Sequence, residues 1–320
     1  MKRISIIGSG NVGTNTAFFI AETRTAEVLL VDIKEGVAAG KALDLMEAGP
    51  VRGYATSIRG TVRIDDIAGS DVVIIAAGIT RKPGQQREDV YRKNAPIVRA
   101  IARDIRRLAP GALVINIAEP IDLLTLLVQE TLGAERFKVM GVGGLLSSTR
   151  IRFLVSQALE VSPREVTGLI IGPHHASMVF LRDTIRVSGI PAETLLGKAR
   201  LGELIEEARN AGDTILQLAQ RSSSFYASSA AAAALVEAIV CNTKALLPVS
   251  VRCEGEYGVK GLAIGVPAYV GEQGVTGIVQ LKLSDADRDA FDKAAAALKT
   301  AHDNIVAGAA KGGHHVEEQG

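Results

Sequence analysis

A glycine-rich turn near the N-terminus constrains the fold more than any other stretch of the sequence. In ISIIGSGNVGTNTAFFI, Gly8, Gly10 and Gly13 come directly after a β-branched apolar run and at the start of a predicted helix. In a dinucleotide-binding unit the first glycine permits the tight turn, the second admits a pyrophosphate, and the third allows close helix packing. The helix N-terminus then offers free N–H groups to the anion. The alternative is a glycine-rich turn without a ligand.

An aspartate lies where the second strand of such a unit would end. Asp32 follows Gly13 by 19 residues and belongs to the run VLLVDI. A carboxylate there can accept hydrogen bonds from the ribose hydroxyls and repels a 2′-phosphate, so we expect NAD rather than NADP. Lys34, close by, argues in the other direction. The further expected contacts to the cofactor are Asn11 and Val12.

The rest of the chain shows two patterns that meet near residue 145. In the first, apolar runs alternate with helical segments, which indicates a parallel sheet covered on both faces; these runs are RISIIG, VLLVDI, TVRI, DVVIIAAG, ALVINIA and KVMGVG. In the second, the strand candidates VTGLII, TIRVSGI, GLAIGVPAYV and GIVQLKL are mixed with helices expected at about 201–218, 227–246 and 284–307. We therefore predict an α/β fold: a Rossmann-type NAD-binding domain over 1–145, an α+β catalytic domain over 146–310 and a polar tail over 311–320.

The composition excludes several kinds of partner. Lys and Arg total 36 against 35 for Asp and Glu, so no basic excess draws the chain to nucleic acid or to an anionic membrane. No run approaches the roughly 18 apolar residues of a membrane span. Cys241 and Cys253 cannot make a disulfide framework and match no usual zinc spacing, so we expect bland thiols in a reducing compartment. The sequence predicts a cytoplasmic protein with a small-molecule partner.

Cations gather in two segments that follow predicted strands. In AAGITRKPGQQREDV, a Pro-Gly turn brings Arg81, Lys82 and Arg87 to the carboxyl edge of the parallel sheet, where ligands of such folds bind. Arg150, in GGLLSSTRIR, can present a planar guanidinium to a carboxylate through two parallel hydrogen bonds. We expect an anionic substrate; a solvated basic loop is the alternative.

Two adjacent histidines occur in GPHHASM. Successive side chains of an extended backbone point in opposite directions, so His174 and His175 are not expected to bind one metal ion together. No Cys or acidic residue flanks them at ligand spacing, and we expect no metal site. A single acid/base histidine is the better interpretation once a cofactor and a substrate are at hand.

Taken together and in order, these motifs resemble one enzyme family. GSGNVG, RKPGQQRED, GGLLSSTRIR, GPHHASM and GEYGVKGLAIGVPAYVG follow one another as in the lactate and malate dehydrogenase superfamily, over nearly the whole chain. The chain most closely resembles its lactate-dehydrogenase-like malate dehydrogenase branch. This resemblance implies a two-domain enzyme, a homodimer or homotetramer, that uses NAD to interconvert a 2-hydroxy acid and a 2-oxo acid.

The resemblance also implies roles for single residues. Arg150 would clamp the substrate carboxylate, Arg87 would polarise the reacting carbonyl, and His174 would exchange the proton at the carbonyl oxygen. Arg81 would accept a second carboxylate, which favours malate and oxaloacetate, because a buried cation facing only a methyl group would be poorly paired. The remaining implied contacts are Asn94, toward substrate and cofactor, and Ser224, toward the substrate.

The chain departs from the family pattern at three places. It reads GPHHA where the family usually reads GGHGD, so His174 is kept while His175 and Ala176 are unexpected. Ser147 replaces the aspartate that orients and charges the histidine, and Glu119 replaces an asparagine whose amide helps bind the substrate oxygen. Replacing the corresponding aspartate of the serine-protease triad by asparagine costs about 10⁴ in turnover, so we expect an altered proton-transfer apparatus.

Several interpretations of these departures are open. Glu119 can supply the missing charge from the substrate side of His174, with Ser147 able to hold only a tautomer. Alternatively, the substrate is another 2-oxo or imino acid, or the protein binds NAD with little catalysis, or His175 is a replacement acid/base group. The leading hypothesis is an NAD-dependent malate dehydrogenase-like enzyme. Its expected catalytic residues are His174, Arg87, Ser147 and Glu119.

Overall fold

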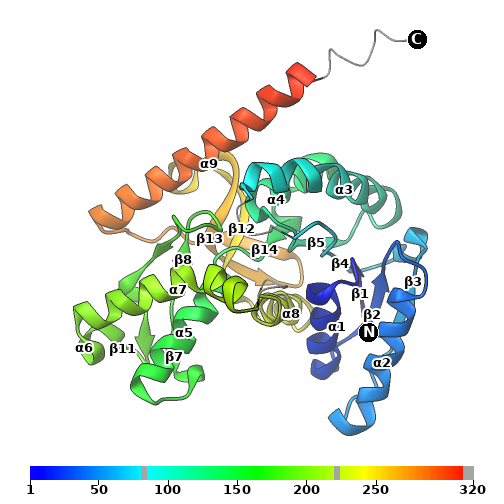
Figure 1. Ribbon diagram of the computed structural model, residues 1–320, viewed down its shortest axis with the longest axis horizontal. Coiled ribbons are helices and arrows are strands. Elements are labelled where there is room, and N and C mark those ends of the chain that lie inside the picture. The colour runs from blue at the N-terminus through cyan, green and yellow to red at the C-terminus, as the bar shows by residue number, and fades with distance from the viewer. Residues whose placement is uncertain (81–84, 220–223, 313–320) are drawn as a thin grey trace.

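The largest of three β-sheets in the described residues is a mixed sheet that runs through the centre of the fold. The computed structural model describes residues 1–80, 85–219 and 224–312, with side chains as far as residue 307 (Figure 1). Within these ranges a nine-stranded sheet has the order β14-β13-β12-β6-β5-β4-β1-β2-β3. Its strands are β1 (Lys2–Ile7), β2 (Ala26–Val31), β3 (Ile58–Thr61), β4 (Val72–Ile75), β5 (Leu113–Asn116), β6 (Val139–Gly141), β12 (Ala245–Glu254), β13 (Lys260–Gly271) and β14 (Gly274–Ile278).

The first six strands form the parallel part of the sheet. Their order, β3-β2-β1-β4-β5-β6, reverses direction between β1 and β4, and in such sheets ligands bind outside the carboxyl ends of the strands at this point. The central strands β4 and β5 are wholly buried, as expected of strands with helices on both faces. The helices are α1 (Asn11–Thr23), α2 (Val37–Arg52), α3 (Arg87–Leu108) and α4 (Ile121–Leu132). The predicted Rossmann-type fold is confirmed.

An antiparallel meander extends the same sheet. Strands β12, β13 and β14 pair antiparallel in turn, and β12 joins the parallel part where Ser250 lies opposite Gly141 of β6. A side chain at position 141 would not fit here, because a Cβ on Gly141 would lie 3.2 Å from the Cβ of Ser250 and 2.5 Å from the Oγ1 of Thr125. The sheet therefore runs across the expected domain boundary at residue 145, and the division into domains stays a prediction.

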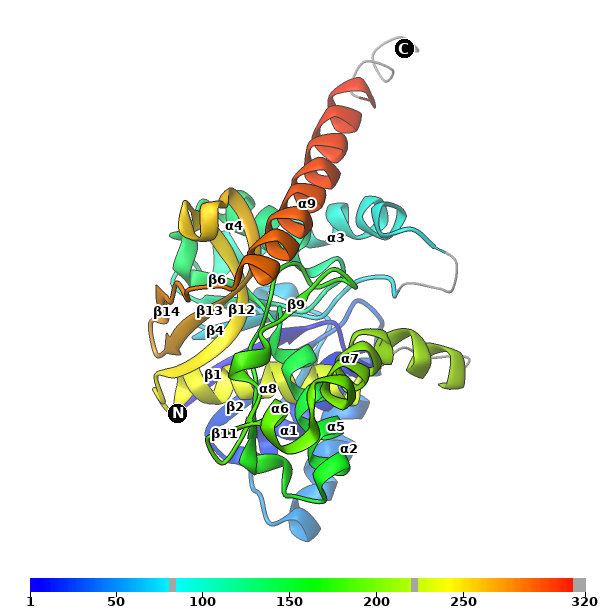
Figure 2. The same ribbon diagram turned by 90° about the vertical axis from the view of Figure 1, so that its left-hand side faces the viewer.

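Most of the remaining elements belong to the second half of the chain and include two smaller sheets, β11-β10-β7 and β8-β9. The helices are α5 (Leu145–Leu159), α6 (Ala192–Leu196), α7 (Lys198–Ala219), α8 (Tyr226–Val240) and α9 (Asp285–Gly312). The short strands are β7 (Val166–Thr167), β8 (Ile170–Ile171), β9 (Val179–Phe180), β10 (Arg186–Val187) and β11 (Ile190–Pro191). The 3-10 helices are Ile64–Ile67, Arg136–Lys138, Pro163–Glu165, Arg182–Thr184 and Glu256–Gly258. Helix α9 packs on the body through Phe291 and Ala294, and Figures 1 and 2 both show its C-terminal part projecting away from the molecule.

Three predicted elements are wrong at their boundaries. The strand expected at GIVQLKL ends early, because β14 ends at Ile278 and residues 279–283 belong to no strand. The helix expected over 227–246 ends at Val240, because Asn242 and Lys244 adopt positive φ angles of 47° and 51° and turn the chain into β12, a strand that the sequence analysis did not expect. The strand expected at TVRI lies earlier, as β3. Gly60 obscured its pattern; this glycine lets α2 pack closely, since a Cβ would lie 2.2 Å from the carbonyl oxygen of Ala38.

Neither cysteine forms a disulfide. Cys253 is buried in β12, where burial raises the pKa of its thiol to about 12, and Cys241 is exposed. A thiol that stays protonated is a poor nucleophile, which agrees with the bland role expected for Cys253. Among the described helices, none combines the length and the apolar character needed to cross a membrane.

Candidate active site

The glycine turn between β1 and α1 is built for close backbone approach. Gly8 has a φ of 104°, and a Cβ there would lie 2.5 Å from the nitrogen of Ala77. A Cβ at Gly13 would lie 1.9 Å from the carbonyl oxygen of Gly8. By contrast, no atom lies within 4 Å of a Cβ built on Gly10, which caps the N-terminus of α1. The turn therefore leaves open the place where an anion would meet the first N–H groups of the helix, beside Asn11.

The two glycines at the helix should respond differently to substitution. Gly13→Ala should lower the free energy of unfolding by about 1–3 kcal/mol, because its methyl group overlaps the Gly8 carbonyl and forces the helix outward. Gly10→Ala should leave the free energy of unfolding nearly unchanged, because its methyl group points into open space. The same methyl group should weaken NADH binding, because this space is where we expect the anion. Thermal unfolding and NADH fluorescence titration check both variants. Equal stability of the two variants would contradict the packing role of Gly13.

Asp32 lies directly after β2 with its carboxylate fixed by main-chain donors. Its Oδ2 accepts a hydrogen bond from the nitrogen of Ser9 at 2.8 Å, and its Oδ1 accepts one from the nitrogen of Lys34 at 3.1 Å. The side chain of Lys41 donates to the carbonyl oxygen of Ser9. The carboxylate is thus held beside the glycine turn, in the position where we expect it to meet a ribose.

A cavity of about 280 Å³ lies at the carboxyl edge of the parallel strands. The side chains around it come from the ends of β4 and β5, from α3, α5 and α7, and from the loop between β8 and β9. The expected site residues that line it are Val12, Arg87, Asn94, Glu119, Arg150, His174, His175 and Ser224. Arg81, the expected specificity residue, lies outside the described residues.

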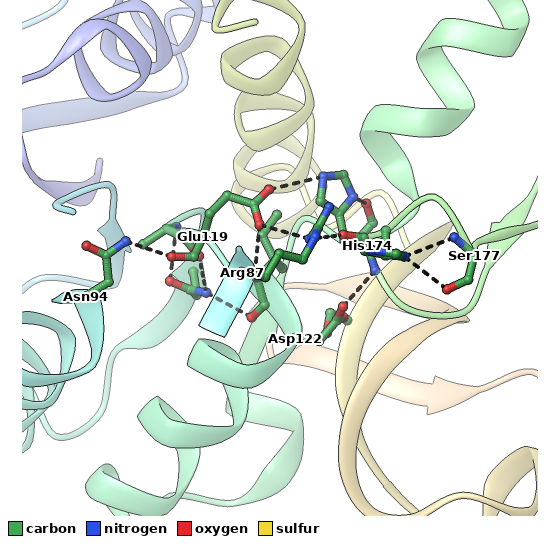
Figure 3. A network of polar contacts seen from close by, with 12 residues as sticks. Arg87, Asn94, Glu119, Asp122, His174 and Ser177 are labelled. Carbon is green, nitrogen blue, oxygen red and sulfur yellow. Dashed lines mark hydrogen bonds and ion pairs between the residues drawn. The ribbon is translucent and has the colours of Figure 1, made fainter. Parts of the chain in front are cut away.

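His174 has acceptors at both ring nitrogens. Its Nδ1 lies 3.0 Å from the carbonyl oxygen of Gly143, and its Nε2 lies 3.4 Å from Oε1 of Glu119 (Figure 3). The ring is nearly buried, with 10% of the side chain exposed. Because Gly143 precedes α5 and Glu119 follows β5, two separate loops fix the histidine ring.

Arg87 and Glu119 complete the cluster around His174. Arg87, the first residue of α3, donates from Nη1 to the carbonyl oxygen of His174 at 2.8 Å, and the same Nη1 lies 3.8 Å from Oε2 of Glu119. Oε2 of Glu119 also accepts a hydrogen bond from the nitrogen of Ile121 at 3.2 Å. Figure 3 shows the three side chains directed toward one another. A cation, a carboxylate and an imidazole therefore meet at one point of the cavity.

Asp122 supports the histidine loop, and the sequence analysis missed it. This buried side chain of α4 accepts hydrogen bonds from the nitrogen of His174 at 2.7 Å and from Oγ of Ser250 at 2.6 Å. Burial raises the pKa of the Asp122 carboxyl, while the two hydrogen bonds and the histidine act in the opposite direction. An acidic residue within the apolar run IDLLTLLV was the available signal in the sequence.

Arg150 projects from α5 into the cavity, and no ion pair joins it to a carboxylate of the described residues. Its Nε is buried and makes no hydrogen bond within the described ranges. Burial lowers the pKa of its guanidinium, although Glu119 and Asp213 act in the opposite direction. Gly212 of α7 leaves room beside it, since a Cβ there would lie 3.4 Å from Nη2. A desolvated cation of this kind favours an anionic ligand with two acceptor atoms.

Asn94 holds the main chain around the cavity. It is fully buried in α3, where Oδ1 accepts a hydrogen bond from the nitrogen of Ile79 at 2.6 Å and Nδ2 donates to the carbonyl oxygen of Glu119 at 2.7 Å. These bonds connect the loop after β4 to the loop after β5. Its expected contacts to substrate and cofactor stay predictions, as does the substrate contact of Ser224.

Ser147 does not hold the histidine tautomer in this structure. The serine is completely buried in α5, and its Oγ has no hydrogen-bond partner among the described residues. The Gly143 carbonyl takes the Nδ1 position instead. A main-chain carbonyl, and not the hydroxyl of Ser147, therefore orients the imidazole ring of His174.

The rest of the histidine loop is held by Arg209, which also lines the cavity. Arg209 of α7 donates from Nη1 to the carbonyl oxygen of Ala176 at 2.6 Å and to that of Met178 at 2.5 Å. His175 is exposed, and its Nδ1 lies 3.3 Å from Oγ of Ser177. The described part of the chain contains no group of three or more His, Cys, Asp or Glu residues arranged to hold a metal ion.

The fold and the cavity define a dinucleotide-binding α/β protein with a histidine and arginines at one site. The chain belongs to the lactate/malate dehydrogenase family: residues 2–141 match its NAD binding domain and residues 145–309 match its alpha/beta C-terminal domain. It is 40% identical over 299 residues to the malate dehydrogenase of Methanosarcina barkeri, covering 93% of this chain and 97% of that protein.

Solved structures agree with this assignment. The malate dehydrogenase of Cryptosporidium parvum superposes with a TM-score of 0.93 at 33% identity, covering 96% of this chain and 99% of that one. The malate dehydrogenase of Salinibacter ruber superposes with a TM-score of 0.92 at 35% identity, covering 97% and 99%. The resemblance to the lactate and malate dehydrogenase superfamily is confirmed.

Proposed function

We propose that this chain is an NAD-dependent malate dehydrogenase, which interconverts malate and oxaloacetate. The observation that carries the proposal is Arg150, whose buried Nε makes no hydrogen bond to the described residues, in the same cavity as His174. Such a cation favours a carboxylate, and a nearby imidazole can exchange a proton with the oxygen on the adjacent carbon. The names of the relatives favour malate and oxaloacetate over a changed substrate or a protein without catalysis.

The glycine turn is the proposed cofactor site. Gly8, Gly10 and Gly13 bring the backbone close to the pyrophosphate, and Asp32 accepts hydrogen bonds from the ribose. When bound, NAD supplies or accepts the hydride. The further proposed cofactor contacts are Asn11, Val12 and Asn94.

In this proposal three arginines bind different groups of the substrate. Arg150 holds the carboxylate beside the reacting carbon, and Arg87 polarises the carbonyl oxygen. Arg81 holds the second carboxylate of malate or oxaloacetate. His174 gives a proton to the carbonyl oxygen during reduction and takes it back during oxidation. Asn94 and Ser224 are the remaining proposed substrate contacts.

We also propose a cytoplasmic homodimer or homotetramer. Helix α2 supports the assembly, because Leu43 and Met46 lie on one of its faces and are 55% and 41% exposed. A second copy that covered them would remove apolar surface from water. The exposed thiol of Cys241 is compatible with a reducing compartment.

The direct test is the oxidation of NADH by oxaloacetate. We expect turnover with NADH and a kcat/KM at least about tenfold lower with NADPH, because the 2′-phosphate would face the fixed carboxylate of Asp32. The assay follows the absorbance of the reduced cofactor with purified protein. NADH binding without turnover on oxaloacetate would contradict the proposed function, and equal use of NADPH would contradict the role of Asp32.

A further inference from the structure

Both ring nitrogens of His174 face oxygen atoms of other residues. A neutral imidazole donates from one nitrogen only, whereas an imidazolium donates from both. Here Nδ1 faces the carbonyl oxygen of Gly143 at 3.0 Å, and Nε2 faces a carboxylate oxygen of Glu119 at 3.4 Å (Figure 3). A proton on either nitrogen therefore has an oxygen atom opposite it, and Glu119 is placed to pair with the imidazolium that forms when both nitrogens carry a proton.

Glu119 links this nearly buried ring to solvent. Its side chain is 40% exposed, against 10% for that of His174. One carboxylate oxygen faces Nε2 of the histidine, and the other is held by the nitrogen of Ile121 and lies near Arg87. The carboxylate is therefore oriented toward the nitrogen that must exchange the proton and remains accessible to water.

The other charged groups near the ring cannot take this role. Asp122 uses its two oxygens on the main-chain nitrogen of His174 and on Ser250, and it is buried. Arg87 lies against the carbonyl oxygen of His174, and its guanidinium, like that of Arg150, has hydrogen-bond donors but no acceptor for a proton. Asp213 lines the same cavity near Arg150, where its charge opposes the effect of burial, which lowers the pKa of the guanidinium. Glu119 is thus the described carboxylate in contact with the ring.

We propose that Glu119 and His174 act as one acid/base pair, in which Glu119 stabilises the imidazolium and carries protons between Nε2 and solvent. This inference rests on the proposed dehydrogenase function. In the family pattern the negative charge beside the histidine belongs to an aspartate at the position of Ser147. In this chain Glu119 supplies that charge at Nε2, while Nδ1 faces the carbonyl oxygen of Gly143.

The proton balance of the pair follows from these contacts. In reduction, the substrate carbonyl oxygen takes the place of Glu119 at Nε2. As hydride adds to the carbon, the π electrons move to oxygen, the new O–H bond forms, and the N–H bond breaks to leave a neutral imidazole. After the hydroxy acid leaves, Glu119, protonated by solvent, gives its proton to Nε2 and returns to the carboxylate form. Oxidation runs through the same steps in reverse.

Nitrogen NMR of ¹⁵N-labelled histidine tests the pair without cofactor or substrate. In the wild type near pH 7, we expect a larger doubly protonated fraction of His174 than in Glu119→Gln, where Nε2 faces a neutral amide. Nδ1 should keep its proton in both proteins, because the Gly143 carbonyl is unchanged. A His174→Ala spectrum assigns the signal. Equal protonation in the wild type and in Glu119→Gln would overturn the proposal, whether or not the enzyme reduces oxaloacetate.

Kinetics test the proton-carrying part separately. Glu119→Gln should lower kcat with oxaloacetate about 10²-fold, change its pH profile and raise its solvent isotope effect, while Glu119→Asp should keep part of the activity. Glu203→Gln is the matched control, because Glu203 makes an exposed ion pair with Arg200. An unchanged pH profile and isotope effect in folded Glu119→Gln would overturn the proton-carrying role. A wild type that fails to reduce oxaloacetate would instead contradict the proposed function.

Discussion

Substitution of His174 by asparagine is expected to lower kcat for oxaloacetate and NADH by about 10²–10⁴-fold, with the affinity for NADH nearly unchanged. The imidazole lies in the substrate cavity, and only its Nε2 faces a group that a substrate can displace. Asparagine keeps the main-chain hydrogen bond to Asp122, so the loop should retain its conformation. Steady-state kinetics and NADH titration together measure the effect.

The neighbouring histidine provides the matched control. His175 is exposed, and its ring contacts Ser177 of its own loop. His175→Asn should therefore keep most of the turnover. If His175→Asn lost as much activity as His174→Asn, the acid/base role would belong to the exposed histidine, and the assignment of His174 would be wrong.

The second large effect is expected at Arg150. Arg150→Lys keeps the positive charge but loses the planar fork that can hold a carboxylate through two hydrogen bonds. Truncation of a buried, hydrogen-bonded charge pair costs about 2–5 kcal/mol, and because lysine keeps the charge we expect a loss of about 10²–10³ in kcat/KM for oxaloacetate. Much of the loss should appear as a higher KM. Initial rates over a range of oxaloacetate concentrations give both constants.

Arg152 offers a control on the same helix. Its Nε donates to the carbonyl oxygen of Val166 at 2.7 Å and its Nη2 to that of Pro163 at 3.2 Å, so it serves the packing of α5. Arg152→Lys should change stability slightly and leave the KM for oxaloacetate as it is. A KM for oxaloacetate that stayed the same in Arg150→Lys would exclude Arg150 as the carboxylate clamp.

The parallel sheet was predictable because its strands carry strong local patterns. The apolar runs that became β4 and β5 are buried on both faces, and the glycine spacing after β1 matches a turn with a specific steric requirement. Strand β12 was missed because Pro248 interrupts its pattern and an alanine-rich helix precedes it. Its pairing with β13, where Pro248 lies opposite Pro267, is a tertiary property that the local sequence does not express.

The chemistry of the site was predictable only where it resides in side chains. The motifs indicated Arg87, Arg150 and His174, and the structure places all three around one cavity. The partner of Nδ1 could not be read from the sequence, because it is the main-chain carbonyl of Gly143, which any residue at that position would offer. Oε1 of Glu119 lies 3.4 Å from Nε2 of His174, which supports the hypothesis that Glu119 faces the substrate side of the ring. The role of Glu119 in proton transfer stays a proposal.

The most direct test of this account is the fate of deuterium in a reaction of oxaloacetate with NADH that carries deuterium at both C4 positions. We predict that the wild-type protein transfers a single deuterium to C2 of malate for each NADH oxidised, and that His174→Asn nearly abolishes this transfer. Mass spectrometry and proton NMR of the product measure it. Oxidation of NADH without deuterium at C2 of malate, or no malate from oxaloacetate and NADH at all, would contradict the account.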